Sequence, residues 1–301
     1  MTRRSEVNVL LAGFGGPETL NQVPAFVESV LGRTPPDHVI PEVVERYRTI
    51  GGGSPLPGTT RRQGELLEKE LGDRGLRARV HVGMLHAPPT IVEAVEEIVG
   101  DGVEDLVVVS LAPYRCEVST DAYEKAVADA LGDRVANVRY APDWNLQPRY
   151  LDALADMLGQ IVEDAPTGSP VIFAAHSLPR RMIDQGDPYA RQLEDTASAV
   201  ASRLGLTKWE LAYQSVSAAA REPWLGPSVE EAMNALVADG AAGVVVDPIG
   251  FIADHVETLY DNDVEHRAHA DAIGLEFHRC RCLNEHPGLI SALADIVEGL
   301  V

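Results

Sequence analysis

Two stretches of the sequence decide the fold: residues 89–109 read PTIVEAVEEIVGDGVEDLVVV, and residues 227–247 read PSVEEAMNALVADGAAGVVVD. A shift of 138 positions superposes the first on the second. Each copy has the period of a helix, then an Asp-Gly turn, then a β-branched run typical of a buried strand. The match favours two similar α/β halves over a chance likeness between generic α/β units. The identical positions are Pro89 and Pro227, Glu93 and Glu231, Ala94 and Ala232, Val99 and Val237, Asp101 and Asp239, Gly102 and Gly240, and Val107-Val108 and Val245-Val246.

Short apolar runs that end at Gly or Pro alternate with longer stretches of helical period along the whole chain. Such uninterrupted runs predict parallel strands whose two faces are both covered by helices, as in a doubly wound sheet. The periodicity breaks near residues 143–150, where we expect the two halves to meet. Ligands of open parallel sheets bind beyond the carboxyl ends of the strands, so two facing sheets would line a cleft there. The four clearest runs are residues 7–11, 106–109, 171–174 and 244–246.

The chain is strongly acidic, with 46 Asp and Glu against 25 Lys and Arg in 301 residues and a formal net charge of -21. This charge repels nucleic acid and anionic membrane surfaces and favours cations as partners. No apolar run is long enough to span a membrane, and residues 1–6 lead into a strand-like run without a signal-peptide core. We therefore expect a cytoplasmic protein with no stable membrane insertion.

Candidate chemistry lies beyond two of the predicted strands. His176 follows the run at 171–175 and is either a functional residue or a hydrogen-bonded structural histidine. Its place at a cleft edge and the turn fixed by Pro179 favour a functional histidine. If a helix starts near Asp254, then Glu257, Asp261 and Glu265 share one face. The alternative is a solvated acidic face. An imidazole beside a row of carboxylates suits a divalent metal in passage and does not suit structural zinc.

The first half contributes glycine-rich turns. The turn at residues 13–17 matches neither dinucleotide nor P-loop signatures, so we expect no nucleotide. The turn at residues 50–56 would let a flat ligand approach the backbone. Arg46, just upstream, could pair with a ligand carboxylate.

Taken together, several motifs in this order resemble ferrochelatases, over a span from about Val7 to the C-terminus. The motifs are Gly15-Gly16-Pro17-Glu18, residues 50–56 (IGGGSPL), Ala175-His176-Ser177-Leu178-Pro179, Gly186-Asp187-Pro188-Tyr189, Pro223-Trp224-Leu225-Gly226-Pro227, and residues 250–265 (GFIADHVETLYDNDVE).

The resemblance implies an α/β fold of two Rossmann-like halves, each a parallel four-stranded sheet flanked by helices, with a porphyrin cleft between them. Residues 1–145 would form a wall of the cleft and residues 146–301 would carry the metal and proton chemistry, with the last helix packing back on the first half. The activity implied is insertion of Fe2+, a substrate, into a porphyrin in haem synthesis. Enzymes next in the haem pathway are then possible partners.

The resemblance also implies roles for individual residues. His176 and Glu257 fall on the family's metal and proton pair, and Asp261 and Glu265 fall on its path for incoming metal. We assign His176 to proton abstraction, as imidazole titrates near neutral pH, and Glu257 to metal delivery or proton relay; the reverse split stays open. The expected porphyrin contacts are Phe14 and His86 against the macrocycle, with Arg46, Ser54, Tyr123 and Ser215 at propionates or walls.

The sequence departs from its relatives at three places. Coproporphyrin-type relatives carry Tyr where Phe14 stands and two Arg where Val30-Leu31 stand, so axial Tyr ligation and those propionate contacts are not available here. Protoporphyrin-type eukaryotic relatives carry a long apolar lip, used at the membrane, near residues 33–46, and this sequence lacks it. The missing lip slightly favours coproporphyrin III over protoporphyrin IX. The alternatives are a chelatase that delivers cobalt or nickel to another tetrapyrrole, and a non-catalytic metal or haem carrier.

Three cysteines, an odd number, do not make a disulfide framework and fit a reducing compartment. Cys116 aligns with the first [2Fe-2S] ligand of cluster-bearing relatives, and Cys280 and Cys282 follow the last predicted strand. A cluster would need a fourth ligand such as His278 or His286. The alternative is three unrelated thiols.

Overall fold

The computed structural model describes residues 6–216 and 221–301. Residues 1–5, on which part of the expectation of a missing export signal rests, and residues 217–220 lie outside the described residues. The chain divides into two compact units. Unit 1 comprises Met1–Trp144 and Asn284–Val301, and unit 2 comprises Asn145–Leu283.

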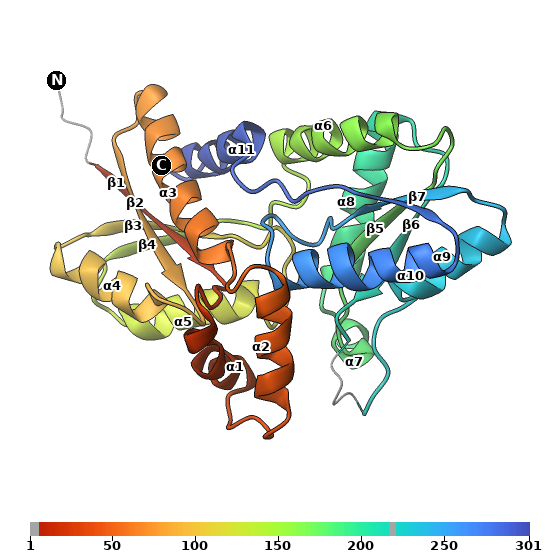
Figure 1. Ribbon diagram of the computed structural model, residues 1–301. Coiled ribbons are helices and arrows are strands. Elements are labelled where there is room, and N and C mark those ends of the chain that lie inside the picture. Colours follow the sequence, from red (N-terminus) through yellow and green to blue (C-terminus); the bar gives the residue numbers. More distant parts are fainter. Residues whose placement is uncertain (1–5, 217–220) are drawn as a thin grey trace. The chain divides into compact units, whose positions relative to one another are not determined.

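Unit 1 is built on a parallel four-stranded sheet in the order β2-β1-β3-β4. Helices α3 and α11 cover one face of this sheet, and α4 and α5 cover the other (Figure 1). The C-terminal helix α11 therefore belongs to the same unit as the first strand. The elements are β1 (Val7–Gly13), a 3-10 turn η1 (Leu20–Gln22), α1 (Val23–Leu31), α2 (Val39–Thr49), α3 (Leu56–Asp73), β2 (Ala78–Met84), α4 (Ile91–Gly100), β3 (Asp105–Ser110), α5 (Thr120–Leu131), β4 (Asn137–Tyr140) and α11 (Pro287–Glu298).

Unit 2 repeats this plan with a parallel sheet in the order β6-β5-β7-β8. Helices α6 and α8 pack together on one face, and α9 and α10 pack on the other (Figure 1). The expectation of two parallel four-stranded sheets flanked by helices is confirmed. The elements are α6 (Pro148–Asp164), β5 (Val171–His176), α7 (Arg180–Asp184), α8 (Tyr189–Leu204), β6 (Trp209–Gln214), α9 (Val229–Ala238), β7 (Gly243–Asp247), a π-helix η2 (Glu257–His266), α10 (Arg267–Ala272) and β8 (Glu276–Arg279).

The sequence repeat corresponds to equivalent structure in the two units. Helix α4 begins with a capping box made by Thr90 and Glu93, and α9 begins with one made by Ser228 and Glu231. In each box the hydroxyl accepts the third backbone N–H while the carboxylate accepts the N–H of the capping residue. Each helix then leads through an Asp-Gly turn into a central strand of its sheet.

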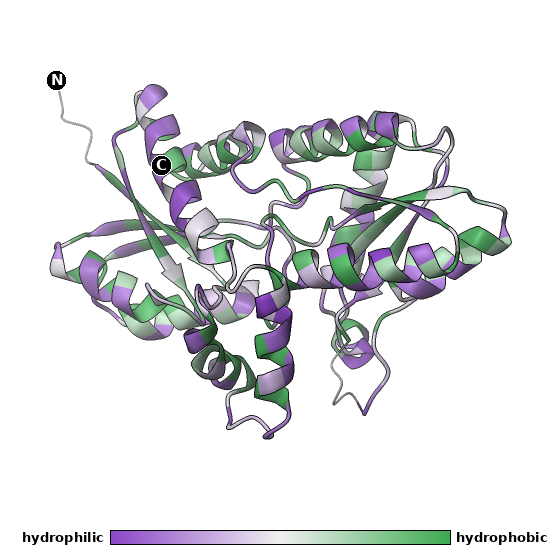
Figure 2. Cartoon of the chain, viewed as in Figure 1, coloured by the Kyte–Doolittle hydropathy of each residue, from purple (hydrophilic) through white to green (hydrophobic). Residues whose placement is uncertain are grey.

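The core follows from the apolar strands. The middle strands are buried on both faces, with Leu10, Leu106, Val171 and Val245 all 0 % exposed. The flanking helices mix hydrophobic and hydrophilic residues around their circumference (Figure 2), as expected for helices with one face on a sheet and one in water. In the described part of the chain, no helix is long and apolar enough to cross a membrane.

Candidate functional site

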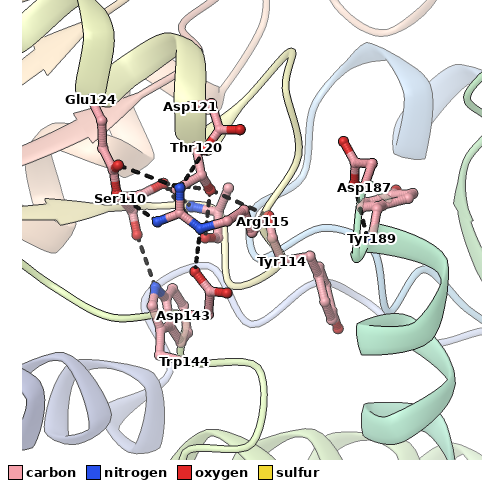
Figure 3. A network of polar contacts seen from close by, with 11 residues as sticks. Ser110, Tyr114, Arg115, Thr120, Asp121, Glu124, Asp143, Trp144, Asp187 and Tyr189 are labelled. Atoms are coloured by element: carbon pink, nitrogen blue, oxygen red, sulfur yellow. Dashed lines mark hydrogen bonds and ion pairs between the residues drawn. The ribbon is translucent and has the colours of Figure 1, made fainter. Parts of the chain in front are cut away.

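His176 is the last residue of β5, at the carboxyl edge of the unit 2 sheet. Its backbone carbonyl accepts a 3.2 Å hydrogen bond from the hydroxyl of Tyr189. Tyr189 is fixed in turn because its N–H donates to Asp187 Oδ1 at 3.0 Å; both residues are drawn in Figure 3. The Gly-Asp-Pro-Tyr motif therefore holds the strand end that carries the histidine.

The hydrogen bond of one ring nitrogen sets the tautomer of His176. Nδ1 contacts the carbonyl oxygen of Ser177, and a carbonyl can only accept, so Nδ1 carries the proton. In the neutral ring, Nε2 then holds the lone pair. Nε2 is the atom that can accept a proton or bind a metal.

Glu257 reaches this histidine because the chain after β7 runs very close to β5. The N–H of Gly250 donates to the carbonyl of Ala174 at 3.1 Å. A Cβ at Gly250 would lie 2.7 Å from the Cβ of Ala175, which a real side chain does not tolerate. Glycine at this position lets the following residues bring Glu257 to the strand end.

The Glu257 carboxylate lies between two histidines. Its Oε1 is 3.5 Å from His176 Nε2, and its Oε2 is 3.7 Å from His255 Nε2. The His255 ring packs on Phe251 with centroids 4.7 Å apart, and its Nδ1 is buried with no hydrogen-bond partner among the described residues. Sequence reasoning did not select His255. The signal was available, because His255 stands two residues before Glu257 in a quoted motif.

The segment that carries the predicted carboxylate ladder is a helix, as expected from the sequence, but it is of the π type and begins at Glu257. Four residues advance slightly more than one turn in an α-helix and slightly less in a π-helix, so Glu257, Asp261 and Glu265 still follow one side. Glu257 is half-buried, Asp261 is buried and Glu265 is exposed. Asp261 Oδ2 accepts a hydrogen bond from the hydroxyl of Ser215, a residue of the left-handed region at φ 61°.

In the described part of the chain, the geometry supplies pairs of ligands and no closed metal cage. Within residues 6–216 and 221–301, no three His, Cys, Asp or Glu side chains are grouped so that they could hold a metal ion. His176 and Glu257 are each partly open to solvent, with side chains 32 % and 29 % exposed. Such a pair suits a metal that is transferred onward more than one that is retained.

Unit 1 places an aromatic group at the carboxyl edge of its own sheet, around the predicted residues Phe14 and His86. Their rings lie 4.7 Å apart in an edge contact, and Phe26 lies 6.3 Å from Phe14. His86 Nδ1 is 2.9 Å from Ser29 Oγ. Burial lowers the pKa of His86 and favours the neutral ring. Both predicted residues are half-buried, so each keeps surface for a ligand.

The other unit 1 candidates lie in different surroundings. Arg46 is exposed in the last turn of α2, Ser54 is 7 % exposed, and Tyr123 is 4 % exposed within the core under α4 and α5. The glycine-rich turn at residues 50–56 was expected to let a flat ligand approach the backbone. At Gly53 the structure gives another reason for glycine: a Cβ there would lie 2.1 Å from the backbone oxygen of Glu18.

A polar network that sequence reasoning missed fixes the loop after β3 (Figure 3). Arg115 donates to Asp143 Oδ1 at 2.8 Å and to Glu124 Oε1 at 3.0 Å, and it also contacts Asp121. Trp144 Nε1 donates to the carbonyl of Ser110 at 2.9 Å. One guanidinium thus ties the loop to α5 and to the segment after β4. In the sequence these residues appear only as charged side chains spaced along the chain, and such spacing is common on helix surfaces.

The structure gives no support to a [2Fe-2S] cluster. Cys116, Cys280 and Cys282 are 2 %, 1 % and 4 % exposed, and burial raises the pKa of Cys280 and of Cys282 above that of an ordinary thiol. Thiols in such surroundings resist the deprotonation that metal binding requires. Of the two histidines considered as a fourth ligand, His286 caps α11 and His278 contacts Glu276 at 2.9 Å.

Comparison with known proteins gives a match over almost the whole chain. A sequence model of the family described as Ferrochelatase matches residues 6–300. A protein of Deinococcus radiodurans named Ferrochelatase is 37 % identical, covering 99 % of this chain and 97 % of its own. A protein of Halalkalibacterium halodurans named Coproporphyrin III ferrochelatase is 32 % identical, covering 99 % of this chain and 98 % of its own.

Solved structures share the fold at much lower identity. SirB from Bacillus subtilis with Fe3+ superposes with a TM-score of 0.62 at 13 % identity, over 98 % of this chain and 95 % of that chain. CbiX, described as the terminal enzyme of sirohaem biosynthesis in denitrifying bacteria, superposes with a TM-score of 0.55 at 13 % identity, over 98 % of this chain and 99 % of that chain.

Proposed function

This chain belongs to the ferrochelatase family, whose members are metal-inserting lyases, and on that premise we propose that it inserts Fe2+ into coproporphyrin III through His176 and Glu257. The observation that carries the residue assignment is the contact between His176 Nε2 and Glu257 Oε1 at 3.5 Å. Family membership favours this activity over the cobalt or nickel chelatase and the non-catalytic carrier considered from the sequence.

Iron insertion requires a proton acceptor and a metal ligand close to the pyrrole nitrogens. Metallation replaces two pyrrole N–H protons by one Fe2+, so two protons leave for each iron that enters. His176 is suited to take the first proton, because its Nδ1–H is committed to the Ser177 carbonyl and its Nε2 lone pair is available. Glu257 then stabilises the imidazolium by charge, and its second oxygen faces His255 as a route for the proton onward.

Iron transfer fits a pair of ligands with open coordination positions. Imidazole and carboxylate both bind Fe2+, and two such ligands leave room for the pyrrole nitrogens to replace water. The Nε2 lone pair of His176 holds either the metal or a proton, so His176 takes the pyrrole proton only when it is not bound to Fe2+. We assign Glu265, Asp261 and Glu257 to the approach of the metal, from the exposed end of η2 to its start. In unit 1 we assign the half-buried Phe14 and His86 to contact with the macrocycle face. Arg46, Ser54, Tyr123 and Ser215 stay as predicted contacts.

The choice of coproporphyrin III rests on the relatives. Proteins named Coproporphyrin III ferrochelatase match this chain at 32 % identity in Halalkalibacterium halodurans and at 35 % in Geobacillus thermodenitrificans, both over nearly its full length. Coproporphyrin III carries four propionates and protoporphyrin IX carries two, so the two substrates differ in the anionic groups that the protein must accommodate.

A direct comparison of the two porphyrins tests the substrate. Purified protein is incubated anaerobically with Fe2+ and either porphyrin, and kcat/KM is taken from the loss of free-porphyrin fluorescence. We expect iron insertion into both, with the higher kcat/KM for coproporphyrin III. A higher value for protoporphyrin IX overturns the substrate proposal, and no insertion into either overturns the activity.

A further inference from the structure

Two buried amide side chains converge on the main-chain carbonyl of Glu257. Gln214 Nε2 donates to this oxygen at 2.7 Å, and Asn262 Nδ2 donates to it at 3.3 Å. Gln214 is 3 % exposed and Asn262 is 0 % exposed, so neither can exchange these bonds for water without local opening. The two amides also contact each other, Asn262 Nδ2 donating to Gln214 Oε1 at 3.2 Å.

Gln214 is joined to the strand that carries His176 as well as to the helix that carries Glu257. It is the last residue of β6 and stands directly opposite His176 in the parallel pairing of β5 with β6. Its carbonyl accepts the N–H of Ser177 at 2.8 Å, and the carbonyl of Ser177 holds His176 Nδ1. One residue therefore links both members of the His176–Glu257 pair through its backbone and its side chain.

The far side of Asn262 is fixed too. Its Oδ1 lies 3.1 Å from the Nδ1 of His266, which is itself 2 % exposed. A buried amide whose donors and acceptor are all engaged resists rotation, because rotation would leave a buried polar group without a hydrogen-bond partner. The start of η2 is thus held against the end of β6 by side chains that do not touch the reacting atoms.

We propose that Gln214, assisted by Asn262, is a positioning residue that sets the separation and orientation of His176 and Glu257. The proposal rests on the proposed function, in which this pair handles metal and protons. The direction of the Glu257 side chain follows from the position of its backbone, and that backbone is held by the two amides. Loss of either donor lets η2 shift relative to β5, which lengthens the path for proton and metal between the two side chains.

The first test removes each donor with little change in side-chain volume. Gln214→Met removes both polar ends of the bridging residue, and Asn262→Asp removes the donor but keeps an oxygen toward His266. Asn145→Asp is the matched control, because Asn145 is a buried amide of unit 2 that donates to the carbonyl of Gln192 and not to the pair.

We expect Gln214→Met and Asn262→Asp each to lower kcat about 10- to 100-fold, the range typical of residues that orient a reacting group. The KM for porphyrin should stay near the wild-type value, because these amides do not bind the macrocycle. The control should keep wild-type kcat even where its melting temperature falls. Wild-type kcat in both variants overturns the proposal, and if one variant does not fold, the other decides.

A double-mutant cycle separates positioning from a general structural effect. Single-turnover insertion is measured for His176→Ala, Gln214→Met and the pair together, and then for His176→Ala with Asn145→Asp. If Gln214 acts through His176 and Glu257, Gln214→Met should lower the insertion rate less than about 2-fold in the His176→Ala background. The reason is that the effects of residues that act as a unit are not additive. If Gln214→Met lowers the insertion rate by the same factor in the His176→Ala background as in the wild type, the positioning role is overturned.

The cycle also distinguishes this inference from the function on which it rests. Full activity in His176→Ala overturns the proposed site and the positioning role with it. Impaired His176→Ala together with wild-type kcat in both Gln214→Met and Asn262→Asp overturns the positioning role and leaves the proposed function standing.

Discussion

At the scale of single residues, the position of one proton on His176 governs what the pair can do. The Ser177 carbonyl holds the proton on Nδ1 and leaves Nε2 facing Glu257. Glu257 in turn faces His255 with its other oxygen. Three titratable side chains therefore stand in a row, with the carboxylate in the middle.

Replacing the middle group gives the first prediction. Glu257→Gln keeps the shape but removes the charge and turns one acceptor into a donor toward an imidazole. We expect kcat for Fe2+ insertion to fall about 100-fold or more, the typical contribution of a positioned acid or base. The control is Glu276→Gln, which alters another His-Glu contact of unit 2, at 2.9 Å from His278, and should keep full activity. Equal loss in both variants, measured by porphyrin fluorescence, would contradict the assignment.

The sequence was sufficient to single out His176 and Glu257, because each follows a recognisable strand or turn and carries a distinctive side chain. His255 and Gln214 were not selected, since neither has a pattern of its own. Gln214 acts through a hydrogen bond between segments 43 residues apart, which only the packed structure brings together. His255 stands two residues before Glu257, but only the structure shows that its ring faces the carboxylate. The roles of all four residues stay predictions until the kinetics are measured.

At the scale of elements, the two capping boxes give a matched pair of tests. Thr90→Ala and Ser228→Ala each remove the hydroxyl that accepts the third backbone N–H of α4 or α9. We expect each to lower the free energy of unfolding by about 1 kcal/mol, the usual value of an N-cap. Urea unfolding monitored by circular dichroism measures it, with Thr167→Ala in an exposed turn as control. A loss as small as the control's in either variant would show that this box is not stabilising.

The C-terminal helix gives a second test at this scale. Arg74, at the end of α3, donates to Asp295 at 2.7 Å and to Glu298 at 2.8 Å of α11, and it pairs with Glu70 at 2.8 Å. Arg74→Met keeps much of the apolar stem and removes these charged hydrogen bonds. Hydrogen exchange should then rise in residues 287–298 and stay unchanged in α9 of unit 2. Unaltered exchange in α11 would mean that apolar packing alone holds the helix.

The fold was predictable at this scale because continuous apolar runs between Gly and Pro specify buried parallel strands. The type of the helix after β7 was not. A carboxylate every four residues fits α- and π-helices almost equally well, so the sequence pattern does not distinguish them. The side-chain donors of Gln214 and Asn262 at the Glu257 carbonyl are tertiary contacts that periodicity does not register.

At the scale of the whole molecule, the acidic composition includes one carboxyl group with an unusual titration. Asp247 is 3 % exposed at the end of β7, and its Oδ2 has no hydrogen-bond partner in the part of the chain that the structure describes. Burial raises the pKa of Asp247 from 3.8 to about 7, although the charge of Arg279 opposes the shift. The folded protein therefore keeps a proton that the unfolded chain releases between these two values.

The sign of the pH dependence follows. Below about pH 4, Asp247 is protonated in both the folded and the unfolded state and does not affect stability. As the pH rises from about 4 towards 7, only the unfolded state releases the proton, so the free energy of unfolding falls. We expect the wild type to lose more stability than Asp247→Asn between pH 5 and pH 8, as measured by urea unfolding at both pH values. Parallel pH dependence in the two proteins would show that Asp247 ionises as easily in the folded state as in the unfolded one.

The most direct test of the His176 assignment is anaerobic single-turnover insertion of Fe2+ into coproporphyrin III by the wild-type protein and by His176→Ala, with folding of both checked by circular dichroism. We expect rapid insertion by the wild type and a loss of at least about 100-fold in the variant, because the proton acceptor at Nε2 is gone. Insertion by folded His176→Ala at the wild-type rate would contradict the assignment.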